Sequence, residues 1–443
     1  MLELDDIQGL VVRGYGALPH ASYLLAAIED RGRARAWLAT LAGRLDDARE
    51  RPGALAVNVA FTRTGLAALG VPAPTLERFP LPFVVGMTDP HRSRLLGDVE
   101  GSAPEHWDWG GPQSAPVDVL LLVYARDARE LGRATEELRG AAGIRVVGEL
   151  DTAELQPREH FGFRDGISQP RIEGLGEGPA ANTIKAGEFV LGYRNEYGLL
   201  PDAPPGALGR NGSFLVLRQL SQDVHGFWDF CERASARADG TVDEAARLRL
   251  AAKLVGRWPG GAPLALAPDA DAPELADAND FGYFHGDRHG LGCPVGAHVR
   301  RAHPRDSLDP DPGSQRSIDV GKRHRLLRRG RQYGRFLAPE VLLTAGVDEA
   351  WLQEPRGLHF VCLGTNLSRQ FEFVQHTWIA NPRFAGLHDD PDPLLGPAGS
   401  TFTVPARPVR DRYTGLPRFV SVHGGAYFLL PGIRAVRELA AAG

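Results

Sequence analysis

Short runs of apolar residues recur along the chain, and the polar positions between them indicate which elements the runs form. Residues 54–61 and 117–125 are almost continuously apolar and rich in Val and Leu, which is typical of buried strands. Residues 126–140 follow with apolar positions at helical spacing, and residues 144–150 have the pattern of another strand. This order of strands and helices predicts an α+β layer.

The rest of the first half is less regular. Residues 22–45 carry apolar positions at helical spacing with many Ala and Arg residues, which predicts an amphipathic helix. Residues 62–69 predict a short helix that Gly70 ends. Residues 7–15 predict a short strand or an opening loop, and residues 72–116 are rich in Gly and Pro and predict irregular structure.

The second half repeats the same usage of strands and helices. Strands are predicted over 212–220, 358–364 and 426–430. Helices are predicted from Asp223 onward, over 245–254 and over 367–378. With 443 residues the chain is too long for a single hydrophobic core, so two domains with a duplicated sheet-and-helix layout are expected.

Composition and charge exclude several classes of protein. Hydrophobic residues make up 43% and charged residues 24% of the chain, and the net charge is −5. These are values of ordinary globular proteins, and they give no reason to expect a nucleic acid or an acidic membrane surface as a partner.

Cysteine usage and the apolar runs predict a cytoplasmic protein. The three cysteines, Cys231, Cys293 and Cys362, are far apart and odd in number, which does not fit a disulfide framework. The N-terminus lacks the pattern of a signal peptide, and the longest apolar run, residues 119–125, is too short to span a bilayer.

An aspartate among glycines and aromatic residues is the first candidate for chemistry. Asp165 follows Phe161 and Phe163 and lies between Gly162 and Gly166, which permit a sharp turn against a ligand. Burial among aromatic rings would raise the pKa of this carboxyl, and such a group can shuttle protons. The alternative is an ordinary Asp-Gly turn on the surface.

A histidine preceded by small residues is the second candidate. In the segment 292–301, small neighbours would allow a flat, bulky group to approach the imidazole of His298, as an axial iron ligand requires. A lone histidine is more often a structural residue. His303 is a rival, although Pro304 and the nearby arginines indicate a solvated loop.

Two other kinds of site could occupy the same region. Cys293 and His298 could form a nucleophile pair of a haem-free hydrolase. His285 and His289 have the spacing of zinc ligands on a helix, but the three glycines around them disfavour a helix, and the glutamate of a metalloprotease helix is missing. Zinc is therefore not expected.

An arginine cluster occupies residues 324–334. It could form a solvated basic face or a nucleic-acid patch, but it lacks the interleaved aromatic residues on which bases stack. The alternation along this run places Arg328 and Arg329 on opposite sides, so one of them could point inward.

Taken together, these segments resemble the dye-decolourising peroxidase family, in particular its longer bacterial-type members. The segments that carry the resemblance are Gly162-Phe-Arg-Asp165-Gly166, Cys293-Pro-Val-Gly-Ala-His298, Leu327-Arg328-Arg-Gly-Arg-Gln-Tyr333, and further blocks at 8–15, 211–220, 356–362, 370–375 and 424–428. Each block is a weak pattern, but their order along nearly the whole chain is specific. Two departures are Val295-Gly296, where Phe-Ala is commoner, and His303, where Asn is usual.

The resemblance implies two ferredoxin-like domains in tandem, over residues 1–185 and 186–443, with haem b in the second. It implies His298 as the proximal iron ligand, Asp165 as the distal acid and Arg328 as the distal arginine. It also implies that Leu358 and Phe360 cover the distal face and, more loosely, that Asp392 accepts the N–H of the proximal imidazole. Tyr333 and Trp378 are oxidisable and are candidates for an electron relay, although an aromatic residue at such a place is more often simple packing.

The implied activity is that of a haem peroxidase. Its substrates would be hydrogen peroxide and a phenolic, dye-like or other aromatic one-electron donor, with an acidic pH optimum, and the resemblance favours a homo-oligomer. A haem carrier or sensor on the same fold, and the hydrolase described above, are the competing hypotheses.

Overall fold

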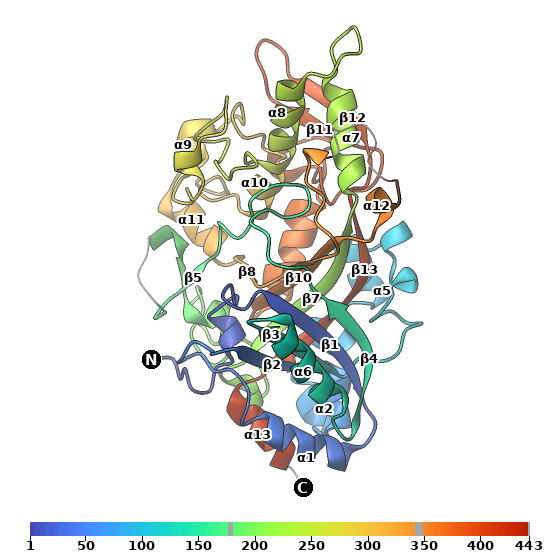
Figure 1. Cartoon of the computed structure of the whole chain (residues 1–443). Coiled ribbons are helices and arrows are strands. Elements are labelled where there is room, and N and C mark those ends of the chain that lie inside the picture. The colour runs from blue at the N-terminus through green and yellow to red at the C-terminus, as the bar shows by residue number, and fades with distance from the viewer. Residues whose placement is uncertain (176–179, 342–348, 442–443) are drawn as a thin grey trace.

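The computed structural model describes residues 1–175, 180–341 and 349–441. Within these ranges, nine strands form one sheet in the order β4-β1-β3-β2-β13-β7-β10-β8, with β9 paired to β10 (Figure 1). The first half of the chain contributes a four-stranded antiparallel unit to it, and the second half contributes a five-stranded one.

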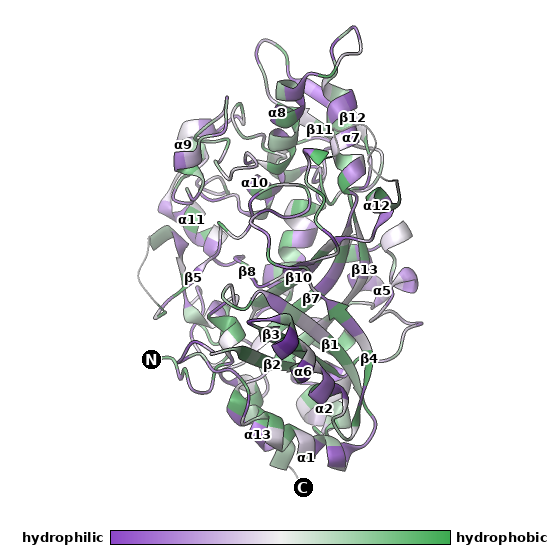
Figure 2. Ribbon diagram, viewed as in Figure 1, coloured by the Kyte–Doolittle hydropathy of each residue, from purple (hydrophilic) through white to green (hydrophobic). Residues whose placement is uncertain are grey.

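The first unit has the ferredoxin-like order, in which the first and third strands are central. Its strands are β1 (His20–Ile28), β2 (Leu55–Phe61), β3 (Val119–Ala125) and β4 (Ile144–Asp151). The crossover helices are α1 (Arg31–Leu41) and α6 (Ala128–Arg139), and each begins after an aspartate whose side chain accepts a backbone N–H. Helix α6 carries a hydrophilic face (Figure 2), and its buried Leu138 faces the sheet core.

The second unit repeats this order with longer connections. Its strands are β7 (Ser213–Gln222), β8 (Leu327–Arg328), β9 (Arg331–Tyr333), β10 (Gly357–Gly364) and β13 (Val420–Leu430). The helices after β7 are α7 (Val224–Ser235) and α8 (Glu244–Val255), and the segment after β10 is formed by two π-helical turns, η9 (Ser368–Glu372) and η10 (Val374–Ile379). The predicted α+β fold of two ferredoxin-like units is therefore confirmed.

Shorter elements complete the described chain. The remaining helices are α2 (Arg63–Ala68), α3 (Ala73–Leu76), α4 (Leu81–Val85), α5 (Pro90–Leu96), α9 (Phe284–Asp287), α10 (His298–Ala302), α11 (Gln315–Lys322), α12 (Glu349–Gln353) and α13 (Ile433–Ala441). The remaining strands are β5 (Arg171–Ile172) with β6 (Thr183–Ile184), and the hairpin β11 (Ser400–Val404) with β12 (Asp411–Leu416). Helices α1 and α13 lie side by side at the lower end in Figure 1.

Three expectations about secondary structure are wrong. The helix predicted over 22–45 is the buried strand β1 followed by the shorter helix α1, because pairing with β3 and β4 overrides the helical tendency of an alanine-rich segment. The segment 72–116, predicted to be irregular, contains the short helices α3, α4 and α5. The glycine-rich segment around His285 forms one helical turn, α9.

The two units join through one residue pair between β2 and β13, in which Phe61 lies opposite Leu429. Both side chains are fully buried in the same core cluster. This junction makes the two units one continuous sheet.

The junction generates a prediction about stability. Phe61→Ala is expected to lower the free energy of unfolding by about 3–5 kcal/mol, because it removes a large buried ring and leaves a cavity. Denaturant titration measures this change. Val409→Ala, at a side chain that is 73% exposed, is the matched control and should change stability by less than about 0.5 kcal/mol. Equal effects of both substitutions would contradict the assigned role of the junction.

Candidate active site

A cavity lined mainly by the second half of the chain encloses about 1600 Å³, part of it open to solvent. Strands β7, β8 and β10, helices α8 and α10, both π-helical turns and the loop that carries Asp165 contribute to its walls. Fifteen of the 28 lining residues are apolar: Phe161, Phe163, Leu220, Val255, Val299, Ala302, Leu326, Leu358, Phe360, Phe371, Val374, Ile379, Leu394, Leu395 and Val420. A large apolar cavity with a few polar groups suits a bulky, flat ligand.

His298 begins helix α10 and lines this cavity. Its Nδ1 lies 2.9 Å from Oδ2 of Asp392, whose side chain is fully buried. The other carboxyl oxygen of Asp392 accepts the backbone N–H groups of Leu394 and Leu395. Because Nδ1 donates to this carboxylate, Nε2 is left as the basic nitrogen, which is the arrangement that holds an imidazole as a metal ligand.

The pKa values of this pair move in opposite directions. Burial acts to lower the pKa of His298, but the carboxylate of Asp392 outweighs it and raises the pKa. Burial acts to raise the pKa of Asp392, and the charge of His298 with its hydrogen bond lowers it instead. Together the two shifts favour an ionised Asp392 that anchors the ring.

Asp165 and Arg328 meet in the same cavity. Nη1 of Arg328 donates to Oδ1 of Asp165 over 2.9 Å, and the same oxygen accepts the N–H of Gly166 over 2.6 Å. The side chains are 44% exposed for Asp165 and 31% exposed for Arg328. Gly166 has a φ of +81°, so the turn that presents Asp165 relies on glycine.

The expected direction of the Asp165 pKa is wrong. Burial does act to raise it, as predicted, but the neighbouring Arg328 charge and the Gly166 N–H together outweigh burial and lower the pKa. The carboxylate therefore stays ionised in mild acid, and it can accept a proton there.

A second cavity adjoins the first and shares one wall with it. The residues common to both are Glu159, Asp165, Arg328, Leu358 and Phe360. Leu358 and Phe360 thus lie on the same side of the large cavity as Asp165 and Arg328. The second cavity, of about 1090 Å³ including open space, gives small molecules a route to the acid and the guanidinium.

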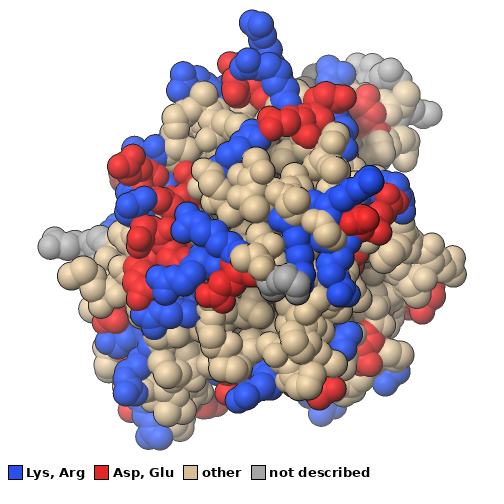
Figure 3. All heavy atoms as spheres, turned by 90° about the horizontal axis from the view of Figure 1, so that it is seen from below, with Lys and Arg blue, Asp and Glu red and all other residues tan. Residues whose placement is uncertain are grey.

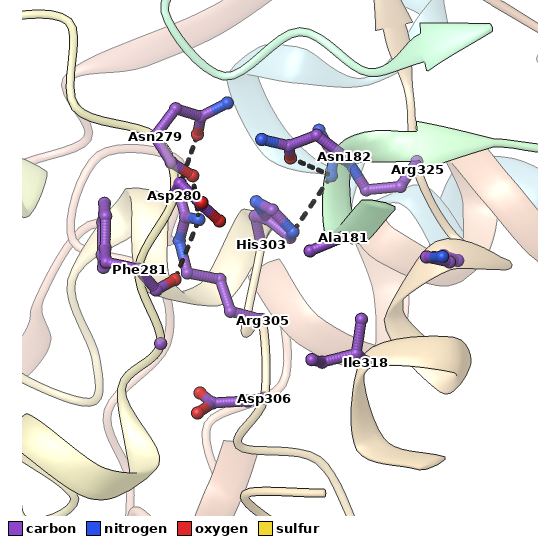
Figure 4. Close-up of a pocket in the computed structure, with 12 residues that line it drawn as sticks. Ala181, Asn182, Asn279, Asp280, Phe281, His303, Arg305, Asp306, Ile318 and Arg325 are labelled. Carbon is purple, nitrogen blue, oxygen red and sulfur yellow. Dashed lines mark hydrogen bonds between the residues drawn. The ribbon is translucent and has the colours of Figure 1, made fainter. Parts of the chain in front are cut away.

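His303 is held by other protein groups. Nη1 of Arg325 donates to its Nε2 over 3.2 Å (Figure 4). Its Nδ1 lies 3.3 Å from the hydroxyl of Ser168. Burial, helped by nearby arginines, keeps the pKa of His303 well below its usual range. The expectation that His303 lies in a solvated loop is wrong, since it is half-buried with both ring nitrogens engaged.

Neither the haem-free hydrolase nor the zinc site is supported by the geometry. Cys293 is fully buried, and burial raises the pKa of its thiol to about 12, so it is not a nucleophile at neutral pH. His285 and His289 do not belong to any group of three or more metal-ligating side chains in the described chain. All three cysteines are free and buried.

The arginine cluster of residues 324–334 forms neither a solvated basic face nor a nucleic-acid patch. Arg325 and Arg331 are 6% and 3% exposed, and Arg329 donates to the carbonyls of Leu10 and Val11. The run therefore points inward at several positions rather than at one. On the face shown in Figure 3, basic and acidic side chains are interspersed.

The two relay candidates lie outside the cavity wall. Tyr333 stacks on His359 with a centroid distance of 4.6 Å, and burial raises the pKa of its phenol to about 12. Trp378 is buried and packs edge-on against both His324 and Phe373, which stack on each other. Trp378 is flanked in η10 by Val374 and Ile379, which do line the cavity.

Sequence reasoning missed two residues of the site. Glu159, which lines both cavities, stands just before the motif that contains Asp165. Arg325 lines the large cavity, and in the sequence it is one of several arginines in a basic run. Nothing in the sequence distinguishes a buried arginine from an exposed one within such a run.

Comparison with known protein sequences shows the family to which the chain belongs. No family model matches the chain. The chain is 32% identical to a dye-decolorizing peroxidase of Auricularia auricula-judae, over 98% of this chain and 86% of that protein. It is 31% identical to a multifunctional dye peroxidase of an Amycolatopsis species, over 98% and 96% of the two chains. The chain belongs to the dye-decolorizing peroxidase family.

Solved structures of this family share the fold. The crystal structure of the Auricularia auricula-judae enzyme complexed with imidazole matches with a TM-score of 0.86 and 26% identity over all of both chains. A structure described as an engineered heme pocket of a dye-decolorizing peroxidase matches with a TM-score of 0.85 and 26% identity, also over both whole chains.

The ion pair of the site generates a prediction. Because the pKa of Asp165 is lower in the fold than in the unfolded chain, its ionised form stabilises the protein above the unfolded value of about 3.9. This stabilisation is lost as the pH falls through the folded value. The difference in melting temperature between the protein and Asp165→Asn should therefore shrink as the pH falls from about 5 to about 3. A difference that grows toward low pH would contradict the lowered pKa.

Proposed function

We propose that this chain is a haem b peroxidase that uses hydrogen peroxide to oxidise phenolic, dye-like or other aromatic one-electron donors. Membership of the family supports a peroxidase. The observation that carries the assignment is the cavity that brings together His298, backed by Asp392, and the Asp165–Arg328 pair. We propose residues 1–185 and 186–443 as its two domains.

The residues present fit iron protoporphyrin. The cavity is largely apolar, and the imidazole of His298 has its Nε2 free of hydrogen bonds to the described residues. Arg257, Arg305 and Arg325 also line the cavity, and none of them pairs with a carboxylate in the described chain. Burial lowers the pKa of Arg325 to about 9 and that of Arg257 to about 10. Buried cations without a counter-charge suit the two propionates of haem.

Three sets of residues would hold the group. His298 would bind the iron, with Asp392 fixing the tautomer and raising the basicity of the ring. Leu358 and Phe360 would cover the face on the side of Asp165 and Arg328. Arg325 and its neighbours would bind the propionates. When bound, the haem would supply the redox chemistry, in which the peroxide O–O bond is reduced and donors are then oxidised one electron at a time.

Asp165 and Arg328 would act on the peroxide itself. The ionised carboxylate of Asp165 would accept a proton from one oxygen of the peroxide and return it to the other. The guanidinium of Arg328 stabilises the negative charge that develops as the O–O bond breaks. The lowered pKa of Asp165 keeps the base available in acid, consistent with the expected acidic optimum.

Electron donors too large to enter the two cavities would react at the surface. Tyr333 and Trp378 are then candidates for carrying electrons inward, and Trp378 lies next to residues of the cavity wall. Among the described residues, no helix is both long and apolar enough to cross a bilayer. We propose a cytoplasmic location from the free, buried cysteines, and a homo-oligomer by likeness to the family.

The catalytic roles are tested by substitution. Asp165→Asn and Arg328→Leu are each expected to lower the rate of the reaction with peroxide by about 10²–10⁴-fold, because each removes a proton-transfer or charge-stabilising group. Stopped-flow absorption measures this rate, and the Soret band shows that haem binding survives. His298→Ala should instead remove the axial ligand and change that band. A variant pair with unchanged rates would favour a haem carrier or sensor.

The cation-rich wall is tested by haem titration. Arg325→Leu is expected to weaken haem binding by about 10–100-fold, which corresponds to the loss of one charge-assisted hydrogen bond of about 1.5–3 kcal/mol. The stability of the haem-free protein should not fall by a similar amount, because the substitution also removes an uncompensated buried charge. Arg316→Leu, at an exposed arginine of α11, is the matched control. Equal haem affinities of the two variants would contradict the proposed contact.

A further inference from the structure

Glu159 lies where the two cavities meet. Five described residues line both cavities, and Glu159 and Asp165 are the two acids among them. The proposed chemistry uses Asp165 and leaves Glu159 without a role. A second carboxyl on the path to the reacting group is therefore the feature that most needs an explanation.

The carboxyl of Glu159 holds the backbone turn that leads to Asp165. One oxygen accepts the N–H of Phe163 and the other accepts the N–H of Phe161, each over 3.0 Å. The backbone closes the same turn, since the N–H of Glu159 donates to Phe163 and its carbonyl accepts from Gly162. Gly162 has a φ of +94°, and a Cβ there would lie 2.4 Å from Pro339, so the turn is tight. The position of Asp165, two residues later, depends on this turn.

No cation neutralises Glu159. Across the parts of the chain that the structure describes, its carboxyl has no ion pair with an arginine, lysine or histidine. Its third partner is the neutral amide of Gln222, at the end of β7, which donates from Nε2 over 2.9 Å. Burial therefore dominates and raises the pKa of Glu159 to about 7, and the nearby charge of Asp165 adds to the rise.

The amide oxygen of Gln222 can accept a hydrogen bond from a protonated Glu159. Its Oε1 is buried and has no hydrogen-bond partner among the described residues. If Glu159 is protonated and the amide turns over, the carboxyl O–H can donate to this orphaned oxygen, while the backbone N–H groups keep their acceptors. Asn and Gln amides can turn in this way without a change of shape. The pair can therefore hold Glu159 in either its neutral or its ionised form.

We propose that Glu159 is a positioning residue of this active site, which fixes the turn presenting Asp165 and, through a proton shared with Gln222, sets the charge where the two cavities meet. This inference rests on the proposed peroxidase function. With Glu159 neutral, the positive potential of Arg328 acts in full on the breaking O–O bond. With Glu159 ionised, the added negative charge offsets that potential and slows the step.

Several charged groups line the cavities with Glu159, among them Glu154, Arg329 and Arg331 of the second cavity. Asp165 follows it on the same loop, and Arg328 faces it from β8. Strand β10 contributes the apolar Leu358 and Phe360. The charge of Asp165 raises the pKa of Glu159. The proton exchanged by Glu159 reaches solvent through the second cavity.

The experiment compares the haem-loaded protein with Glu159→Gln, which is uncharged at every pH. Its amide nitrogen cannot accept one of the two backbone N–H groups, so the variant carries an offset that does not depend on pH, and the change of the ratio with pH is the readout. The rate constant with hydrogen peroxide and the melting temperature are measured from about pH 4 to about pH 9, on either side of the unfolded and folded pKa values. The ratio of rate constants, variant over wild type, is expected to rise by about tenfold through neutral pH, which corresponds to one pKa unit of interaction. Because the folded protein holds this proton more tightly than the unfolded chain, the stabilisation present in acid is lost as the pH rises through about 7. The wild-type melting temperature should therefore fall relative to the variant over the same range.

Two controls separate this inference from the proposed function. Glu340→Gln, at an exposed glutamate that pairs with Arg158, should leave both pH profiles parallel to wild type. Glu159→Ala, which removes all three hydrogen bonds, should lower the peroxide rate at every pH because the turn loses its support. Parallel melting curves of wild type and Glu159→Gln, or a constant rate ratio, would overturn the proposal. A protein that does not react with peroxide would contradict the proposed function. The melting comparison needs no peroxide, so it would still decide the role of Glu159.

Discussion

The hydrogen bond between the buried carboxylate of Asp392 and Nδ1 of His298 is the interaction on which the site depends. The carboxylate is fully buried and is stabilised by two backbone N–H groups as well as by the imidazole. A buried anion is tolerated only with such partners. The consequence is a fixed tautomer, in which the other ring nitrogen is available to a ligand in the cavity.

Around this anchor the structure gathers positive charge. Arg301, a fully buried residue of helix α10, donates to the carbonyls of Gly296, Trp378 and Asp390 and so ties α10 to η10 and to the loop before Asp392. Arg257, Arg305 and Arg325 face the cavity with neutral acceptors only, as far as the described chain extends. Such desolvated cations cost stability in the protein alone. An anionic cofactor would recover that cost, so the cavity is better suited to a loaded state than to an empty one.

Much of the fold was predictable because its periodic patterns are strong. The all-buried strand β3 and the polar helix α6 follow directly from their residue patterns. Strand β1 was not predictable locally, because an alanine-rich segment becomes a strand only through its pairing with β3 and β4. The π-helical turns η9 and η10, which shape one cavity wall, leave no mark in the sequence either.

The site shows the same division between local and long-range information. Motifs located Asp165, His298 and Arg328, and the fold brings all three to one cavity. The pKa of Asp165 was predicted in the wrong direction, because its partner Arg328 lies far away in sequence. His303 and Arg325 were likewise misjudged, since their mutual hydrogen bond exists only in the folded chain. The charge state of a side chain depends on partners that lie far away in the sequence. A single sequence does not reveal which residues those partners are.

The most direct test is the absorption spectrum of the haem-loaded protein before and after one equivalent of hydrogen peroxide. We expect a Soret band that changes rapidly on addition and returns to its starting form after two equivalents of a one-electron donor such as a phenol. A spectrum that peroxide leaves unchanged, or a protein that binds no haem when it is supplied in excess, would contradict the account.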